Sequence, residues 1–516
     1  MNSPISMSSP VFARAYERVP HSDTRLDKHF HRDQRARYLL AYSLRRCLQL
    51  LKKPVPAIIV VLALQVVFNS SYSNPASFTI PPENVFIAAN INDGQLVLGD
   101  WGTSLIETCK LVGPERTHVS VYGGPLMAMR ELEARLSAAG CDNTIVAEEM
   151  EPIDWSSLYR VEVAPGEYRV KRISYLAAIR NRALAPLDGL SKRFDKILFL
   201  NDVLFQASDA ARLLFATNVR HDGKTGYKAA CAVDFHHSWK FYDTFALRSS
   251  DGYYPGVRIY PWFASKGDGI SRRDVLSNTD SVRVKSCWGG MVAFDAKYFQ
   301  AAAGQHNTTI GTTPIRFRFE HEPFWDSSEC CLVHSDLQGI PNDTENVTDA
   351  STGIYMNPFV RVTYKASTYR WLPLVRRFER LFIVPNALIN HFTHMPEYNP
   401  RRDEIPQSTV LDWTWVYDGT TRPSPSSAIP VRQKQGDHFN SERETGQLTA
   451  RDTSEAQYRS LWRAKGYLQR SNRTATRDGF CSTRQLLVIN EGAMVSPNTG
   501  TNWEAAAIPP WPKNDS

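Results

Sequence analysis

Hydrophobic and polar positions along residues 84–235 alternate between runs typical of strands and spacings typical of helices. Short apolar runs, which predict buried strands, occupy residues 84–90, 117–123, 143–149, 196–205 and 227–235. Apolar residues at every third or fourth position predict helices at residues 102–113, 125–140, 167–187 and 210–218. Strands that alternate with helices pair mostly in parallel through right-handed crossovers. The pattern therefore predicts an α/β fold with a mixed, mostly parallel sheet flanked by helices.

The regular pattern ends in the second half of the chain. From about residue 250 the sequence is irregular and rich in aromatic residues, which predicts loops and short strands that complete a site in the same domain. Residues 419–516 begin with a polar, Pro- and Ser-rich stretch, which predicts a partly flexible C-terminal region with a helix near residues 453–468. We therefore expect one domain over residues 84–418.

An apolar run at residues 55–68 precedes the first predicted strand. Basic residues lie upstream of it, and no Lys or Arg follows until Lys110. By the positive-inside rule, this predicts a cytosolic tail over residues 1–53, a transmembrane signal anchor over residues 54–72 and a stem over residues 73–83. A cleaved signal peptide and a buried core helix are the alternatives. The anchor predicts a single-pass type II membrane protein with its main domain in the lumen.

The charge distribution argues against a nucleic-acid partner. Residues 1–53 contain 11 Lys or Arg and 4 Asp or Glu, so this basic tail carries the whole net charge of +7. The rest of the chain is neutral and offers no basic footprint for nucleic acid.

Cysteines and glycosylation sequons fit a luminal domain. Seven of the eight cysteines follow the apolar run at spacings that match no zinc motif, so we expect structural disulfides with one thiol left over. Asn-x-Ser/Thr sequons occur at Asn69, Asn307, Asn342, Asn346, Asn472 and Asn514.

The candidate chemistry begins with KILFLNDVLF, residues 196–205. Asn201 and Asp202 interrupt an apolar run, where a carboxylate is unfavourable unless it is paired, hydrogen-bonded or bound to a cation. Parallel sheets bind ligands beyond the carboxyl ends of their strands, which is where these residues are expected. Since Mg²⁺ and Mn²⁺ favour oxygen ligands, Asp202 is a candidate metal ligand with Asn201 as its helper. Capping of a loop or helix is the alternative.

Two further segments offer polar groups that could bind a nucleotide-diphosphate substrate, the donor in a group transfer, beside such a cation. In the predicted helix at 167–187, Arg180 lies within the apolar face and Asn181 at its edge. Arg180 either pairs with a structural acid or reaches a buried anion. Asp234 ends another apolar strand, where it is either a second ligand or the start of a loop.

The segment SCWGG places Trp288 before Gly289 and Gly290. A Trp face stacks well on a sugar ring, and glycines allow the backbone to approach a ligand closely. The three residues are therefore candidates for donor binding. The alternative is a tight turn over a core tryptophan.

Later acidic and histidine residues are candidates for catalysis and metal binding. A glycosyl transferase needs a carboxylate near the reacting sugar, and Asp326 and Glu329 are the leading candidates in an acidic stretch. His394 is a candidate metal ligand, although two histidines at this spacing are more often structural. Signatures of serine hydrolases, HExxH metalloproteases, P-loop enzymes, kinases and dinucleotide-binding folds are missing from the sequence.

Eight segments together point to a known family. In chain order they are ISYLAAIRNRAL, KILFLNDVLF, KAACAVDF, YDTFALRSSDG, SCWGGMVAFDA, IRFRFE, SSECCLVHSDL and IYMNPFVRVTY. The set resembles the fungal alpha-1,3-mannosyltransferase and capsule-associated protein family, glycosyltransferase family 69, of the cryptococcal mannosyltransferase type. The resemblance covers roughly residues 84–370.

The resemblance implies a GT-A-like nucleotide-sugar-binding fold in a Golgi membrane enzyme. It implies GDP-mannose as donor, an oligosaccharide or other glycoconjugate as acceptor, Mn²⁺ or Mg²⁺ as cofactor, and an alpha-1,3-mannoside product for fungal wall, capsule or glycoconjugate synthesis. Asn201 and Asp202 occupy the place of the family's metal-binding acidic motif. An alpha-linked donor and product mean retention, either through a covalent intermediate or by same-face attack with the diphosphate as base. The alternative function is a non-catalytic Golgi subunit that supports polysaccharide synthesis or export.

Overall fold

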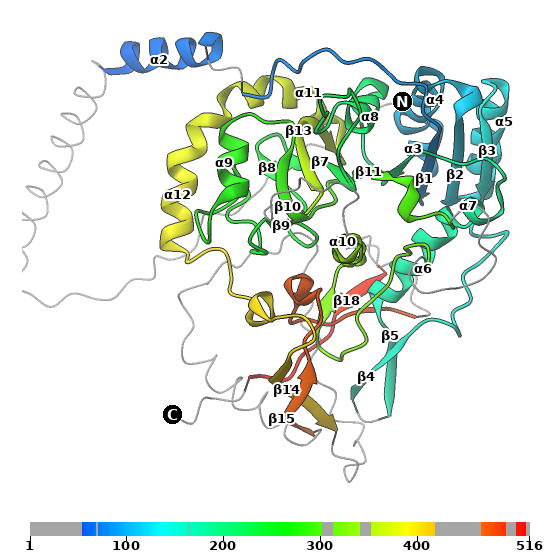
Figure 1. Cartoon of the computed structure of the whole chain (residues 1–516), viewed down its shortest axis with the longest axis vertical. Coiled ribbons are helices and arrows are strands. Elements are labelled where there is room, and N and C mark those ends of the chain that lie inside the picture. The colour runs from blue at the N-terminus through cyan, green and yellow to red at the C-terminus, as the bar shows by residue number, and fades with distance from the viewer. Residues whose placement is uncertain are drawn as a thin grey trace, which may run out of the picture. The chain divides into compact units, whose positions relative to one another are not determined.

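The computed structural model describes residues 54–68, 71–164, 166–301, 313–340, 352–417, 466–491 and 502–511. The chain divides into two compact units, residues 1–68 and 69–516. The second unit contains the central sheet and its helices (Figure 1). The predicted cytosolic tail lies outside the described residues.

In the first unit, the apolar run forms helix α2 (Pro54–Phe68) of 15 residues. Across the described ranges, no helix is both long and apolar enough to pass through a membrane. The predicted end of the anchor at residue 72 is wrong, because Ser71 and Tyr72 are buried in the second unit. The Tyr72 hydroxyl donates to the carbonyl of Val275 at 2.9 Å, and its ring packs edge-on against Phe359.

The second unit is built on a ten-stranded sheet. In spatial order its main strands are β3 (Asp142–Val146), β2 (Thr117–Gly123), β1 (Val85–Ile91), β6 (Lys196–Leu200), β11 (Met291–Asp295), β7 (Ala229–His237), β13 (Ile354–Thr363), β10 (Val282–Ser286) and β9 (Arg248–Ser249), and β8 (Lys240–Phe241) pairs with β7. Strands β3, β2, β1, β6, β7 and β13 run in one direction, whereas β11 and β10 run against them. The predicted mixed, mostly parallel sheet is confirmed.

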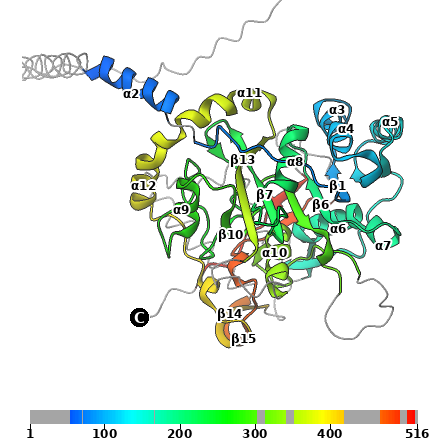
Figure 2. The same ribbon diagram turned by 45° about the horizontal axis from the view of Figure 1, so that its top comes forward.

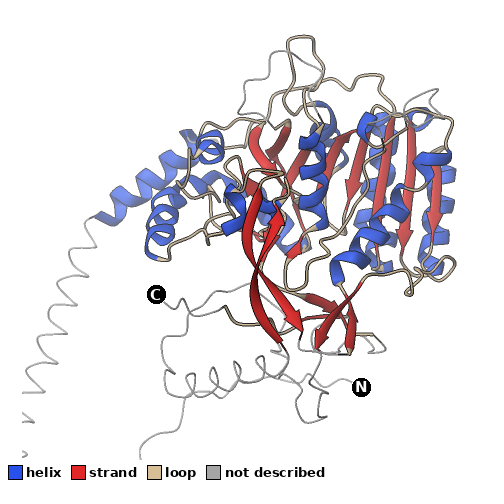
Figure 3. Cartoon of the chain, turned by 60° about the horizontal axis from the view of Figure 1, so that its bottom comes forward, coloured by secondary structure: helices blue, strands red, loops and turns tan. Residues whose placement is uncertain are grey.

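Alternating side chains of the central strands feed two separate cores. In the parallel register of β1 and β6, Phe86 and Phe199 point to one core, whereas Ile87 and Leu198 point to the other. The second core is closed by α3 (Gly94–Leu98), α4 (Asp100–Val112), α5 (Leu126–Ala138) and α8 (Ala207–Phe215). The first core is closed by α6 (Arg172–Leu184), α7 (Pro186–Gly189), α9 (Ile270–Leu276), α10 (Glu329–Gly339) and α11 (Ala366–Val375). Figure 3 shows the strands of the sheet side by side with helices packed on them.

The helix predicted at 167–187 begins later than expected. Residues Glu167–Val170 form β5, which pairs with β4 (Arg160–Ala164) as an antiparallel hairpin, and α6 starts at Arg172. Exposure falls along β5, because Glu167 and Tyr168 are exposed whereas Val170 is fully buried, so the hairpin leads the chain from the surface into the core.

The C-terminal residues extend the domain beyond its predicted end at residue 418. Strand β14 (Thr409–Tyr417) pairs with β15 (Gly466–Thr474). The last three residues of the helix predicted at 453–468 are therefore strand, and residues 453–465 lie outside the described residues. Two further antiparallel pairs follow: β16 (Ser482–Thr483) pairs with β12 (Asp326–Ser327), and β17 (Leu487–Ile489) pairs with β18 (Trp503–Ala505). The remaining short helices are η1 (Pro114–Arg116), η2 (Ala296–Tyr298), η3 (Arg376–Phe382), α12 (Ile383–Phe392), η4 (Pro400–Asp403) and η5 (Gly479–Cys481).

The expected disulfides and leftover thiol are confirmed. The three bonds are Cys109–Cys141, Cys231–Cys287 and Cys331–Cys481. Cys330 is free and buried. Among the sequons, Asn472 lies on β15 with an exposed side chain, and the other five lie outside the described residues.

Candidate active site

The carboxyl ends of the parallel strands bring several predicted residues to one edge of the sheet. β2 lies on one side of β1 and β6 lies on the other, so the strand order reverses between β1 and β6. Open α/β sheets bind ligands at such a reversal. Asp93 follows β1, while Asn201 and Asp202 follow β6. Asp234 lies near the end of β7, and Tyr364 follows β13.

Asn201 connects several parts of this edge through hydrogen bonds. Its backbone N–H donates to the carbonyl of Gly290 at 2.9 Å, and its own carbonyl accepts from the indole of Trp101 at 2.8 Å. Its side-chain oxygen accepts from Nη1 of Arg180 and from the indole of Trp288, both at 3.2 Å. Two donors use the two lone pairs of that oxygen. Asn201 is therefore better described as a positioning residue than as the metal ligand that was predicted.

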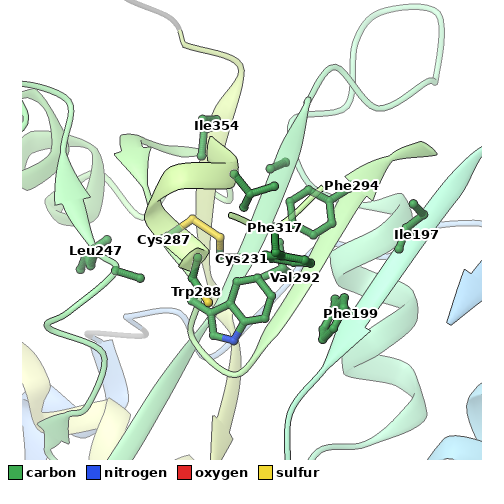
Figure 4. Packing of buried hydrophobic residues seen from close by; sticks show 14 of the residues in the cluster. Ile197, Phe199, Cys231, Leu247, Cys287, Trp288, Val292, Phe294, Phe317 and Ile354 are labelled. Atoms are coloured by element: carbon green, nitrogen blue, oxygen red, sulfur yellow. A yellow bond between two sulfur atoms is a disulfide. The ribbon is translucent and has the colours of Figure 1, made fainter. Parts of the chain in front are cut away.

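Arg180 and Glu329 form a buried ion pair beside Asn201. Nε of Arg180 donates to Oε1 of Glu329 at 2.9 Å. The guanidinium lies 4.3 Å from the centre of the Trp288 ring and is also close to the rings of Phe199 and Phe317. Figure 4 shows these three aromatic side chains in one cluster. Of the two alternatives for Arg180, the structure thus shows pairing with an acid.

Asp202 is the open carboxylate of this edge. Its side chain is exposed, and within the described residues no other residue donates a hydrogen bond to its carboxyl group. Partial burial by the surrounding protein raises the pKa of Asp202, Arg180 lowers it and Asp93 raises it. Loss of hydration is the largest of these effects, so a bound cation would compensate the carboxylate of Asp202 mainly for the water that the surrounding protein displaces.

Buried Asp234 and half-buried Asp243 form a second acidic pair. Oδ1 of Asp234 accepts from the backbone N–H of Asp243 at 3.0 Å, and the Tyr364 hydroxyl lies 3.5 Å from Oδ2. Burial, and then the charge of Asp243, raise the pKa of Asp234 well above its usual range. The backbone N–H groups of Ala246 and Gly289 donate to Asp243 at 2.9 and 3.4 Å. The pair thereby ties the loop after β7 to the turn before β11.

That turn needs its glycines. Gly289 and Gly290 have φ of +58° and +70°, a left-handed conformation that side chains disfavour. A Cβ atom on Gly289 would lie 2.0 Å from the carbonyl oxygen of Ala232, and one on Gly290 would lie 2.6 Å from a methyl group of Val203. The close approach lets Trp288 lie against the strand ends, and the disulfide Cys231–Cys287 holds the preceding residue (Figure 4).

Asp326 serves the fold rather than the site. It is fully buried, its Oδ1 lies 3.2 Å from Nζ of Lys171, and its Oδ2 accepts from the backbone N–H of Leu487 at 2.8 Å. The predicted catalytic role is corrected accordingly, because both oxygens are engaged in joining separate segments of the chain.

Two other predicted residues, Asn181 and His394, do not join Asp202 at the edge of the sheet. Asn181 donates to the carbonyl of Phe317 at 2.8 Å and accepts from its backbone N–H at 2.9 Å, so it holds the irregular segment whose Phe317 ring packs edge-on against Trp288. His394 follows α12 with an exposed side chain, and α12 lies on one side of the domain, away from β6 (Figure 2). The structure does not bring His394 to Asp202.

Asp243 and Tyr364 were not selected as candidates from the sequence. Asp243 stands in a loop within YDTFALRSSDG, and Tyr364 is the last residue of IYMNPFVRVTY. Neither position is marked by a hydrophobic period, and only the pairing of β7 with β13 places them together. The one sequence signal that could have identified them is that both lie in segments that resemble the mannosyltransferase family.

A histidine and two cysteines cluster elsewhere in the domain. Ligand atoms of Cys231, Cys287 and His334 lie within 4.8 Å of one another, and they are the sole such group of three among the residues that the structure describes. The two cysteines form a disulfide, so this group offers no thiolate to a metal.

Comparison with known families decides the class of this domain. Residues 84–336 match the model of a family described as Cryptococcal mannosyltransferase 1. This domain belongs to the cryptococcal mannosyltransferase family. The assignment agrees with the resemblance found from the sequence segments, and it supports glycosyl transfer as the activity. No curated protein sequence matches the chain.

Solved glycosyltransferase structures show a distant similarity. A mannosyltransferase from Pyrobaculum calidifontis, in complex with GDP-Man and Mn²⁺, is 10% identical with a TM-score of 0.29, over 63% of this chain and 75% of that one. Glucosyl-3-phosphoglycerate synthase from Mycobacterium tuberculosis, in complex with Mn²⁺, UDP and phosphoglyceric acid, is 11% identical with a TM-score of 0.27, over 66% of this chain and 88% of that one.

Proposed function

We propose that this domain transfers mannose from GDP-mannose to a hydroxyl group of a glycan acceptor, with retention and in alpha-1,3 linkage, on a GT-A-like fold. The observation that carries the proposal is the open carboxylate of Asp202 at the reversal of strand order in a mannosyltransferase-family domain. Divalent cations are commonly held between one or two carboxylates and the phosphates of a nucleotide, and open α/β sheets bind their ligands at such an edge.

The donor set at this edge fits Mn²⁺ or Mg²⁺. Such ions are commonly held by one or two carboxylates, while phosphate oxygens and water complete the coordination. Asp202 offers a carboxyl group without a donor from another described residue, and Asp93 lies close enough to raise its pKa. When bound, the ion would neutralise charge on the leaving diphosphate.

The ion pairs of the site favour one of the two retaining routes. Glu329 is held by Arg180, and Asp326 is held by Lys171, so neither is free to attack the anomeric carbon. We therefore favour same-face attack. The bond between the anomeric carbon and the diphosphate oxygen breaks, the bond to the acceptor oxygen forms on the same face, and a diphosphate oxygen takes the acceptor proton. Asn201 orients Arg180 and the indole of Trp288. Trp288 is only 4% exposed and has the guanidinium over its ring, so it supports the site from the core and is the core tryptophan of the alternative prediction.

The proposal includes the luminal side of a Golgi-type compartment as the location. Three disulfides in the domain support it, because such bonds persist in oxidising compartments.

The test is transfer by the purified full chain from a panel of nucleotide sugars, with and without EDTA and with Mn²⁺ restored. We expect transfer from GDP-mannose only with the divalent ion, and a loss of at least about a hundredfold in Asp202→Asn, in which the carboxylate charge is removed. Asp222→Asn, an exposed carboxylate in the loop after α8, is the matched control and should transfer normally. Full metal-dependent activity in Asp202→Asn would refute the metal role. Absence of turnover with every donor would instead indicate a non-catalytic subunit.

A further inference from the structure

Helix α12 is polar where it meets the domain and apolar where it meets solvent. Asn386 and Asn390 are buried at 0% and 6% exposure, whereas Val384, Leu388 and Phe392 are 65%, 53% and 75% exposed. A surface helix of a soluble protein normally shows the opposite arrangement. The inversion indicates that the outer side of α12 is adapted to a non-aqueous neighbour.

The buried asparagines are firmly bonded, so the orientation of α12 is fixed. Oδ1 of Asn386 accepts from Nη1 of Arg272 at 2.6 Å, and its amide donates to the carbonyl of Ile259 at 2.9 Å. Oδ1 of Asn390 accepts from the backbone N–H of Val257 at 2.8 Å. Rotating the helix to hide its apolar side would leave these buried polar groups without partners, which is costly.

The preceding segments α11 and η3 also carry exposed apolar residues. We define the outer apolar face as Trp371, Leu374, Leu381, Val384, Leu388 and Phe392, all of them exposed. The last four follow one another at spacings of three and four residues, so they lie on one side of the helical segment. Several exposed apolar residues gathered on one side of a helical segment mark a site of interaction. Figures 1 and 2 show α11 and α12 at the outside of the domain.

Basic residues accompany this face. Lys365, Arg370 and Arg377 are exposed on or beside α11 and η3. Apolar and aromatic side chains with Arg and Lys alongside are the composition of helices that lie in a membrane interface, where the cations meet lipid phosphates.

The chain enters the domain beside the same face. Ser71 donates to Oε1 of Glu379 in η3 at 2.7 Å, and Nη1 of Arg376 donates to the carbonyl of Tyr72 at 2.9 Å. Only two residues separate Ser71 from Phe68, the end of the apolar run, a reach of about 10 Å at most. The sequence therefore joins the apolar run to the domain through the residues that contact η3.

From these observations we propose that the outer apolar face docks on a lipid bilayer, with Arg370 and Arg377 at the headgroup phosphates. The occupant is the membrane surface and not a protein, because apolar side chains, flanking cations and the entry of an apolar segment coincide at one place. The docking surface is separate from Asp202 and its neighbours, and it does not depend on the proposed transfer reaction.

The test uses the full chain with Ile58, Ile59, Val60 and Leu64 replaced by Ser, so that the apolar run no longer dominates membrane binding. Flotation with vesicles of phosphatidylcholine and about one quarter phosphatidylserine measures the bound-to-free ratio. We expect this parent to bind, and Leu388→Asp with Phe392→Asp to lower the ratio at least about tenfold, since two apolar anchors are lost and charges are added. Met127→Asp with Val219→Asp, which changes two exposed apolar residues elsewhere, is the matched control and should bind like the parent.

Further variants and readouts keep the proposal refutable. Arg370→Gln with Arg377→Gln should weaken binding to anionic vesicles more than to neutral ones. Leu388→Ser is a milder substitution to be used if the Asp pair alters the unfolding midpoint. Unchanged flotation of the face variants would overturn the proposal. The proposal would also be overturned if the parent were a dimer without lipid, the face variants were monomers, and both floated equally well. The face would then join two copies of the chain.

Discussion

Glu329→Gln removes the charge of the buried carboxylate that pairs with Arg180 and keeps its shape. The two groups are 2.9 Å apart, and at an effective dielectric constant of about 20 their attraction is about 6 kcal/mol. Gln can still accept the hydrogen bond from Nε, but the guanidinium loses its counter-ion while it stays buried. Breaking a buried pair from one side costs roughly 3 to 5 kcal/mol, and the retained hydrogen bond puts the expected loss near the lower value, about 3 kcal/mol.

The assay is urea unfolding at pH 7 with intact disulfides, followed by tryptophan fluorescence. Glu151→Gln is the control. Glu151 lies 3.7 Å from Arg182, which is on the same helix as Arg180, and both side chains are about half exposed. That change should cost less than about 1 kcal/mol. The double variant Arg180→Met with Glu329→Leu should be less destabilised than the sum of its single changes, since no buried charge remains. A loss below about 1 kcal/mol in Glu329→Gln would refute the argument, because the pair would then not be an ionic contact of the folded state.

Two further predictions concern the region around the disulfide beside Trp288. Burial lowers the pKa of His334 to about 4, so the folded protein resists protonation there while the unfolded chain takes up a proton near pH 6.5. The free energy of unfolding should therefore fall by up to about 3 kcal/mol as the pH drops from about 6.5 to 4. In His334→Gln it should change less over this range, and identical dependence on pH in the two proteins would contradict the prediction. Replacing Cys231 and Cys287 by Ser removes a disulfide that closes a loop with a sequence separation of 56. The free energy of unfolding should fall by about 4 kcal/mol, and transfer should also fall because the turn at Trp288 loosens. An unchanged melting temperature would contradict this prediction.

The sheet could be predicted because its strands are local patterns. The run at 117–123 became β2 with the same bounds, and β1 and β6 lie within one to five residues of their predicted limits. The strand at 167–170 was missed because its partner, β4, decides its conformation. The link between β12 and β16 was beyond prediction, since the paired residues are about 155 positions apart and no local pattern encodes the pairing.

The site could be predicted where it depends on strand ends and not where it depends on ion pairs. Asn201, Asp202 and Asp234 stand at or after apolar strands, and the topology brings those ends to one edge. Asp326 and Glu329 look alike in sequence, but Lys171 binds the first and Arg180 the second. Both cations lie some 150 residues upstream, so the difference between a structural acid and a site acid is set by tertiary packing alone.

Cys481 gives the domain a fixed order of assembly during synthesis. Arg248 is fully buried, and its guanidinium donates to the carbonyls of Phe480 and Cys481, which are made 232 and 233 residues later. Until those residues leave the ribosome, burial of Arg248 lacks two of its acceptors and is opposed by desolvation. Cys331 must also wait 150 residues for its partner, with the Cys330 thiol beside it. A nascent chain that stops after residue 417 thus lacks both acceptors of Arg248 and the disulfide partner of Cys331, so it cannot complete this part of the fold.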